Sequence, residues 1–262
     1  VNLLKKVNSP TGGFWEVTYQ KTTNSYNLPQ VKYTMSSVKT YDGFAADNSY
    51  SPDYTLSTFE YTNPNQDRRE REFFGFGTVR TNLLDVLNND ALYKYTIQEF
   101  HNDNYYLKGS SKRETLYDAN DVIWTQKLTT YGIYETISTG NITINPTIYG
   151  FTDTTTPIDA INALNLEFID SNFTYPAPGT SHNCTLLDYS RLFVTPIVTI
   201  ERFTEGLGIT NAKSNVTLLE NFDAFGNILR YRNYGEQNTD VYTSTITYYP
   251  SIAGLSYSPG FA

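Results

Sequence analysis

The sequence predicts an all-β fold, in which consecutive antiparallel β-hairpins form a curved open sheet with at most one or two short helices. Apolar and polar residues alternate along several runs. Phe59 and Tyr61, for example, are out of phase with Thr58 and Glu60, and this period of two is typical of half-buried strands. Aromatic residues make up 15% of the chain, with 23 Tyr against 15 Phe, and such side chains suit a partly wet sheet surface better than a dry core. Clusters of Gly, Pro, Asn and Asp separate the runs and mark the turns.

The first elements are predicted to be a hairpin and a bulged strand. The segments Leu3–Val7 and Phe14–Tyr19 flank a Ser-Pro-Thr-Gly-Gly turn, whose glycines can supply positive φ. In the strand that begins at Val31, the apolar alternation falls out of phase at Val38. This change of phase predicts a bulge near Ser36–Ser37.

The stretch Leu56–Arg80 is predicted to be the central hairpin. Its turn is predicted at Asn63–Gln66, because Pro presets φ for a reversal and Asn can hydrogen-bond to its own backbone. The return strand is then predicted to begin with six charged residues: Asp67, Arg68, Arg69, Glu70, Arg71 and Glu72. On a strand these charges divide between two faces. They either pair and fix the register of the hairpin, or form a solvated edge that discourages unwanted strand pairing.

Two glycines lie inside the aromatic segment Phe73–Gly77. Glycine weakens a strand interior, so Gly75 and Gly77 predict a bulge or the close approach of another backbone.

Short helices are predicted at two places. Asn82–Leu87 has a capping Asn with an Asp three residues later, and residues 157–164 follow Thr156 with a proline at the first helical position. Further strands are predicted at Tyr93–Ile97, Ile197–Phe203, Val216–Phe222, Ile228–Tyr231 and Val241–Tyr249.

One turn motif occurs twice, at residues 117–121 and 222–226. Each copy places an aromatic residue at a strand end, Asp at the first turn position and Asp or Gly at the fourth. The first Asp is predicted to cap the amides of a type I turn, and the fourth residue to take a left-handed conformation, which costs Asp121 more than Gly. The motif residues are Tyr117, Asp118, Phe222, Asp223 and Gly226.

Composition limits the classes of protein and partner. At 262 residues the chain is predicted to be a single β-rich fragment, residues 1–262, with a possible sub-boundary in the loop region about 150–180. It opens on Val1 as if in mid-strand, which suggests a piece of a longer polypeptide. The net charge of −8 argues against nucleic acid, and the sequence contains no apolar run that predicts membrane insertion.

No residues are predicted to be catalytic, to bind a cofactor or to bind a metal. His101 and Asp103 could ligate a metal, but no third ligand has matching spacing, so a loop histidine is favoured. The single cysteine, Cys184, has no matched base, and no Gly-rich loop precedes a helix as phosphate binding requires. The remaining enzymatic alternative is a hydrolase that uses two carboxylates, such as a glycosidase.

The repeated aromatic-Asp-X-X-Gly motif resembles the YD repeat of Rhs proteins. The segment Asp67–Gly77, DRREREFFGFG, resembles the signature that precedes those repeats in the B component of Tc insecticidal toxin complexes. LLKKVNSPTGGFWEVTY before it and VTLLENFDAFGNILRYRNYG after it extend the resemblance over nearly the whole chain. Only Tyr41, Tyr117 and Phe222 head recognisable units, which indicates the irregular start of a shell.

The resemblance implies a spiral of β-hairpins that closes into a hollow shell around an unfolded C-terminal toxin segment. It implies as partners the remainder of the parent shell, the enclosed segment and other toxin-complex subunits. It also implies a secreted or cell-surface bacterial virulence protein. The self-cleaving aspartyl site of the family lies at the far end of its shells, and no residue here matches it.

Two functions from different classes therefore remain. The leading hypothesis is a non-catalytic structural wall segment of a toxin-encapsulating shell. The alternative is an aromatic-rich surface for glycan or protein recognition, as in the adhesive shells of teneurins. A wall needs aromatic side chains that pair across strands, whereas recognition needs several that are exposed together.

Overall fold

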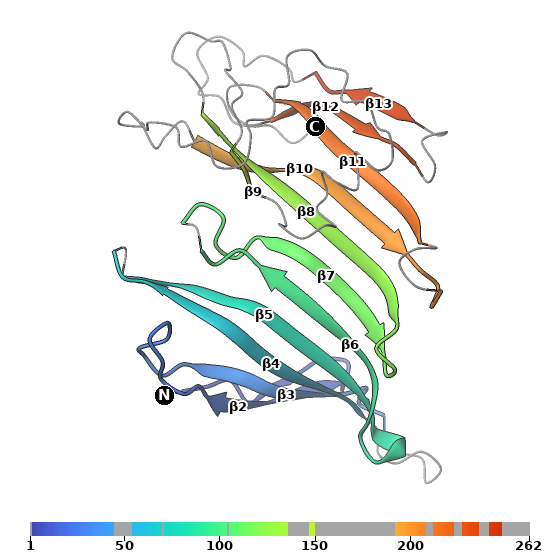
Figure 1. Cartoon of the computed structure of the whole chain (residues 1–262). Coiled ribbons are helices and arrows are strands. Elements are labelled where there is room, and N and C mark those ends of the chain that lie inside the picture. Colours follow the sequence, from blue (N-terminus) through green and yellow to red (C-terminus); the bar gives the residue numbers. More distant parts are fainter. Residues whose placement is uncertain are drawn as a thin grey trace. The chain divides into compact units, whose positions relative to one another are not determined.

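The computed structural model describes residues 2–44, 54–69, 71–103, 105–135, 147–149, 192–207, 212–222, 227–235 and 241–247. Within these residues the chain forms an antiparallel sheet in which sequence neighbours are hydrogen-bonded neighbours (Figure 1). The order runs from β1 to β8 and continues through β10 to β13, while β9 pairs with β8 outside this path. The all-β fold of consecutive antiparallel hairpins is therefore confirmed.

The longest described strands are β4 and β5, each of 14 residues. The strands are β1 (Lys6–Asn8), β2 (Phe14–Lys21), β3 (Tyr33–Tyr41), β4 (Tyr54–Asp67), β5 (Glu72–Asp85), β6 (Ala91–Phe100), β7 (Ser111–Asp118), β8 (Ile123–Glu135), β9 (Thr147–Tyr149), β10 (Leu192–Phe203), β11 (Lys213–Phe222), β12 (Ile228–Asn233) and β13 (Tyr242–Thr245). Among the described residues, no helix is long and apolar enough to cross a membrane.

The chain divides into two compact units. The first comprises residues 1–129 and 201–213, and the second comprises residues 130–200 and 214–262. In the second unit, the side chains of Ile197, Val198, Val216 and Leu218 are buried, each at most 4% exposed. The predicted helix at residues 157–164 and the whole of the possible sub-boundary at about 150–180 lie outside the described residues. The single-domain assignment stays a prediction.

The predicted bulge in β3 is confirmed. Thr18 pairs with Ser37 and Tyr19 pairs with Met35, so Ser36 is the extra residue. The hydroxyl of Thr18 hydrogen-bonds to both Ser36 Oγ (2.8 Å) and Ser37 Oγ (2.7 Å), which provides partners for the side chains at the irregularity.

The predicted turn of the central hairpin is wrong by several residues. Asn63–Gln66 stays within β4, where Pro64 pairs with Phe76, and the chain reverses between Asp67 and Glu72. The described pairs between β3 and β4 end at Thr58, so Pro64 lies where β4 pairs with β5 alone. Proline is tolerated in an edge segment because its missing N–H breaks no ladder hydrogen bond.

The predicted helix at Asn82–Leu87 is also wrong in extent. Asn82 belongs to β5, and only a 3₁₀ turn, Val86–Asn88, follows it. Its cap is Asp85, whose Oδ1 accepts a 3.1 Å hydrogen bond from the N–H of Leu87. Pairing of Asn82 with Tyr95 of β6 outweighs the local capping signal.

Candidate functional site

Of the six charged residues predicted to lie on a strand, the five that the structure describes form the tip of the β4–β5 hairpin, from the end of β4 at Asp67 to the start of β5 at Glu72. Asp67 Oδ1 accepts a 2.7 Å hydrogen bond from the N–H of Arg69, and Arg71 has φ of 54°. These are the features of a tight reversal, so the charge-rich segment supplies the turn itself. Glu70 lies outside the described residues.

The charges at the tip contact other segments. The Arg68 guanidinium lies 3.8 Å from the centroid of the Tyr26 ring, and its Nη2 donates to the Tyr26 carbonyl at 3.3 Å. Glu72 forms a 2.5 Å ion pair with Lys108 of the β6–β7 loop. These contacts attach the hairpin tip to segments on both sides of it in the sequence.

Asn102, in the β6–β7 loop (residues 101–110, of which 101–103 and 105–110 are described), clamps the irregular part of β4 to β5. Its Nδ2 donates to the Asn63 carbonyl at 2.6 Å and to the Gly75 carbonyl at 3.3 Å. Its own carbonyl accepts a hydrogen bond from Asn65 Nδ2. Asn63 has φ of 53°, so the clamp holds a left-handed residue within a strand.

The two glycines of β5 have different roles. Pairing shifts from Asn65 with Gly75 to Gln66 with Phe73, so Phe74 is the extra residue of a bulge that lies next to Gly75, where φ is 102°. A Cβ at Gly77 would lie 3.1 Å from Asn63 Cβ and 3.2 Å from Asn102 Nδ2, so Gly77 permits the close approach of the clamp. The predicted bulge and the predicted close approach thus both occur.

The β6–β7 loop closes on itself at His101. The N–H of His101 donates to the Ser110 carbonyl and its carbonyl accepts from the N–H of Gly109, both at 2.9 Å. His101 is 4% exposed and Leu107 is fully buried. Burial, with a smaller contribution from Lys112, lowers the pKa of His101 to about 4.

The predicted turn at Tyr117 and Asp118 is confirmed. Asp118 Oδ1 accepts hydrogen bonds from the N–H groups of Asn120 (2.8 Å) and Val122 (2.9 Å), and Asp121 has φ of 64°. The bond from Val122 is the largest cause of the lowered pKa of Asp118. In the second copy, Asp223 and Gly226 lie outside the described residues, and only the backbone of Phe222 is described, at the end of β11.

Tyr95 of β6 anchors this turn to the sheet. Its ring stacks on Tyr117 with 4.7 Å between centroids, and its hydroxyl donates a 2.6 Å hydrogen bond to Asp121 Oδ1. The Arg80 guanidinium covers the Tyr95 ring at 3.8 Å from its centroid. Burial and the hydrogen bond to Asp121 raise the pKa of Tyr95 to about 12.

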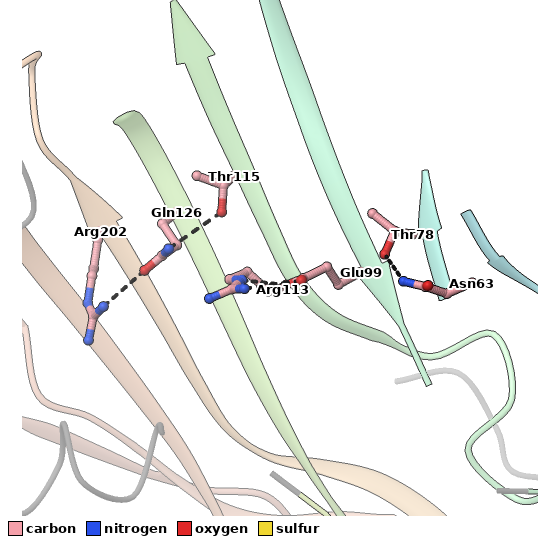
Figure 2. Close-up of polar contacts among 7 residues, drawn as sticks. All are labelled: Asn63, Thr78, Glu99, Arg113, Thr115, Gln126 and Arg202. Carbon is pink, nitrogen blue, oxygen red and sulfur yellow. Dashed lines mark hydrogen bonds and ion pairs between the residues drawn. The ribbon is translucent and has the colours of Figure 1, made fainter. Parts of the chain in front are cut away.

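Polar side chains join neighbouring strands along one face of the sheet. Figure 2 shows Arg113 of β7 bound to Glu99 of β6, and Gln126 of β8 between Thr115 and Arg202. Arg202 Nη1 donates to Gln126 Oε1 at 2.9 Å, although Arg202 is only 9% exposed. Thr115 pairs with Gln126 and Glu99 pairs with Arg113, and paired residues of an antiparallel ladder share a face.

The opposite face also carries polar contacts between strands. Gln98 Nε2 donates to Glu114 at 3.2 Å, and Lys127 forms a 3.3 Å ion pair with Glu201. These residues alternate in sequence with those of the first face, and successive strand residues point to opposite faces. The part of the first unit that spans β6 to β10 therefore has hydrogen-bonded or ionic groups on both sides.

The described residues hold no group of three or more His, Cys, Asp or Glu side chains that could bind a metal. His101 Nδ1 lies 4.0 Å from Asp103 Oδ1, and these two remain the only pair the sequence suggested. The sequence-predicted residues fall at separate places, the hairpin tip and the β7–β8 turn. The contacts made by Asn63, Asn102, Tyr95 and Arg202 were not predicted, because no local pattern indicates their long-range partners.

The fold and contacts define a class of protein, an all-β segment in which hairpins follow one another in a single antiparallel sheet. Residues 1–109 match the family described as "Insecticide toxin TcdB middle/N-terminal region". The crystal structure of TcdB2-TccC3-TEV is similar over 88% of this chain, with a TM-score of 0.55 and 16% identity. TcdB2-TccC3-Cdc42 is similar over 95%, with a TM-score of 0.55 and 16% identity.

A third structure, the Tc holotoxin pore of Photorhabdus luminescens, is similar over 88% of this chain, with a TM-score of 0.54 and 14% identity. The chain corresponds to only 12% to 13% of the length of these three proteins. No curated protein matches the chain. The resemblance to the B component of Tc toxin complexes is confirmed, and the structural likeness shows the shared fold.

Proposed function

We propose that this chain is a non-catalytic wall segment of a toxin-encapsulating shell in a secreted bacterial toxin complex. It is then part of a larger YD-repeat shell, and its partners are the rest of that shell, an enclosed C-terminal toxin segment and other toxin-complex subunits. The similarity to TcdB2-TccC3 structures and the match to the TcdB family over residues 1–109 support this proposal.

The observation that carries the proposal is the polar character of both faces of the sheet in the first unit. A β-sandwich buries one face of each sheet and keeps polar groups on the other. Here Glu99–Arg113 and Gln126–Arg202 lie on one face, and Gln98–Glu114 and Lys127–Glu201 on the other. The Glu99 and Arg113 side chains on the first face are 24% and 25% exposed, and the Lys127 and Glu201 side chains on the other face are 54% and 38% exposed. A sheet with polar groups that reach solvent on both sides can separate an internal compartment from the outside.

The pairing of aromatic side chains supports a wall over a recognition surface. Phe14 stacks on Tyr41 at 4.2 Å, Tyr41 contacts Tyr54 at 5.3 Å, and Tyr95 stacks on Tyr117 at 4.7 Å, each across neighbouring strands. Such pairs stabilise the sheet by about 0.2 to 1 kcal/mol each. The contacts of these aromatic side chains therefore hold neighbouring strands together.

The test uses the full-length protein that carries this chain and follows protease cleavage of its C-terminal segment. Arg202→Ala leaves the buried Gln126 carbonyl without the guanidinium donor, which weakens the contact between β8 and β10. Arg69→Ala, at the exposed hairpin tip, is the matched control. The wall function predicts faster cleavage of the enclosed segment in the Arg202 variant, with wild-type protection in the control.

Two results would overturn the proposal. The first is a C-terminal segment that is cleaved equally fast in the wild type and in the Arg202 variant. The second is turnover of a glycan or ester by the purified protein that is lost on mutation of acidic residues in this chain.

A further inference from the structure

The β6–β7 loop packs on the tip of the β4–β5 hairpin through contacts of several kinds. Asn102 binds the carbonyls of Asn63 and Gly75, and Lys108 forms the ion pair with Glu72. Lys108 also lies over the Tyr105 ring at 4.2 Å and over the Phe74 ring at 5.4 Å. The loop thus acts as a latch that holds the tip in place.

A buried histidine lies at the base of this latch. The backbone of His101 makes both hydrogen bonds that close the loop, to Ser110 and from Gly109. Its imidazole is almost fully enclosed, and an imidazolium in an enclosed site lacks the hydration that it has in water. Protonation of His101 therefore favours any state in which the loop has opened and water reaches the ring.

We propose that the β6–β7 loop is an acid-released latch, in which protonation of His101 frees the tip of the β4–β5 hairpin. Opening separates Asn102 and Lys108 from their partners and exposes Phe74 and Leu107, which are 5% and 0% exposed in the closed loop. Acid then uncovers an apolar surface at the hairpin tip. This inference concerns a conformational change and does not depend on the wall function.

Burial and the charges around His101 determine how opening of the β6–β7 loop depends on pH. Lys112 of β7 lowers the pKa of His101 and Asp103 of the loop raises it, while burial lowers it most. Because the folded pKa of about 4 lies below the ordinary 6.5, the closed loop is favoured above pH 6.5 and loses this advantage as the pH falls toward 4. Between pH 7 and pH 5 the opening equilibrium rises about 20-fold.

The experiment is hydrogen exchange with mass spectrometry on the full-length protein from pH 7 to pH 4, with rates normalised to unstructured peptides at each pH. The peptides that report are those covering residues 101–110 and 67–77. In the wild type we expect about a 20-fold increase in opening between pH 7 and pH 5 in both peptides. In His101→Gln, which cannot be protonated in this range, the increase is absent.

Two further variants test the proposal if His101→Gln opens the loop at every pH. Lys112→Gln removes a charge that opposes protonation in the closed loop, so the closed-loop pKa rises toward 6.5 and the increase in opening between pH 7 and pH 4 becomes smaller, whereas Asp103→Asn lowers that pKa and makes the increase larger. Lys5→Gln, at an exposed lysine in the same unit, is the control and keeps the wild-type increase in opening. A wild-type loop with no acid response, an undiminished response in a folded His101→Gln variant, or responses that do not decrease in Lys112→Gln and increase in Asp103→Asn would overturn the proposal.

Discussion

The side-chain amide of Asn102 donates a 2.6 Å hydrogen bond to the main-chain carbonyl of Asn63, a residue 39 positions earlier in the sequence. This bond, together with that to Gly75, lets a left-handed residue and a glycine bulge occur side by side in the β4–β5 ladder. The irregularity is therefore stabilised by a loop from outside the hairpin.

Replacing Asn102 with Ala leaves two main-chain carbonyls without this donor. We expect local opening of the β4–β5 tip to become easier by about 1 to 3 kcal/mol, the cost of an unsatisfied polar group. Hydrogen exchange of the peptides covering Asn63–Gly77 measures this change. Asn24→Ala, at an exposed asparagine, is the control, and equal exchange in the two variants would show that the clamp does not stabilise the tip.

Replacing either glycine of β5 with Ala should destabilise the hairpin, but for a different reason at each position. Gly75→Ala meets no atom within 4 Å but forces a side chain into φ of 102°, at a cost of about 1 to 2 kcal/mol. Gly77→Ala instead contacts Asn63 and Asn102, at a cost of about 1 to 3 kcal/mol. Adding Asn102→Ala should relieve part of the second cost and none of the first, as measured by hydrogen exchange in the double variants.

Asp121 combines an unfavourable backbone conformation with a favourable side-chain contact. Asp121→Gly removes the strain at φ of 64° but also removes the acceptor for the Tyr95 hydroxyl, so the two effects of about 1 kcal/mol each nearly cancel. In a Tyr95→Phe background the same change should stabilise the turn by about 1 kcal/mol. A double-mutant cycle on thermal unfolding measures the difference, and additive effects would contradict the coupling.

The raised pKa of Tyr95 predicts an alkaline effect on stability. An unfolded tyrosine ionises near pH 10, whereas Tyr95 ionises at about 12, so its stabilising contribution is complete below pH 10 and is lost between pH 10 and pH 12. Tyr95→Phe should make the stability of the first unit less sensitive to pH over this range. The ultraviolet difference spectrum should also lose one late-titrating tyrosinate, and a normal titration of all tyrosines in the wild type would refute the assignment.

The sequence predicted those parts of the fold that depend on residues close together in the chain. The bulge at Ser36 follows from a change of phase, and the turn at Asp118 follows from side-chain chemistry within five residues. The turn at Asn63–Gln66 failed as a prediction, because whether Pro64 reverses the chain or lies in an edge segment depends on where β3 stops pairing with β4. The clamp by Asn102 and the link from Arg202 to Gln126 join residues 39 and 76 positions apart, and neither end carries a recognisable motif.

The most direct test of the wall function is an electron cryomicroscopy structure of the full-length protein with its C-terminal segment present. The account predicts that the strands β4 to β8 form one layer, with an enclosed cavity on one face and the outer solvent on the other. It also predicts that no second layer of the chain covers either Glu99–Arg113 or Gln98–Glu114. A second sheet or helical layer packed over either face, or a C-terminal segment located outside any cavity, would contradict the account.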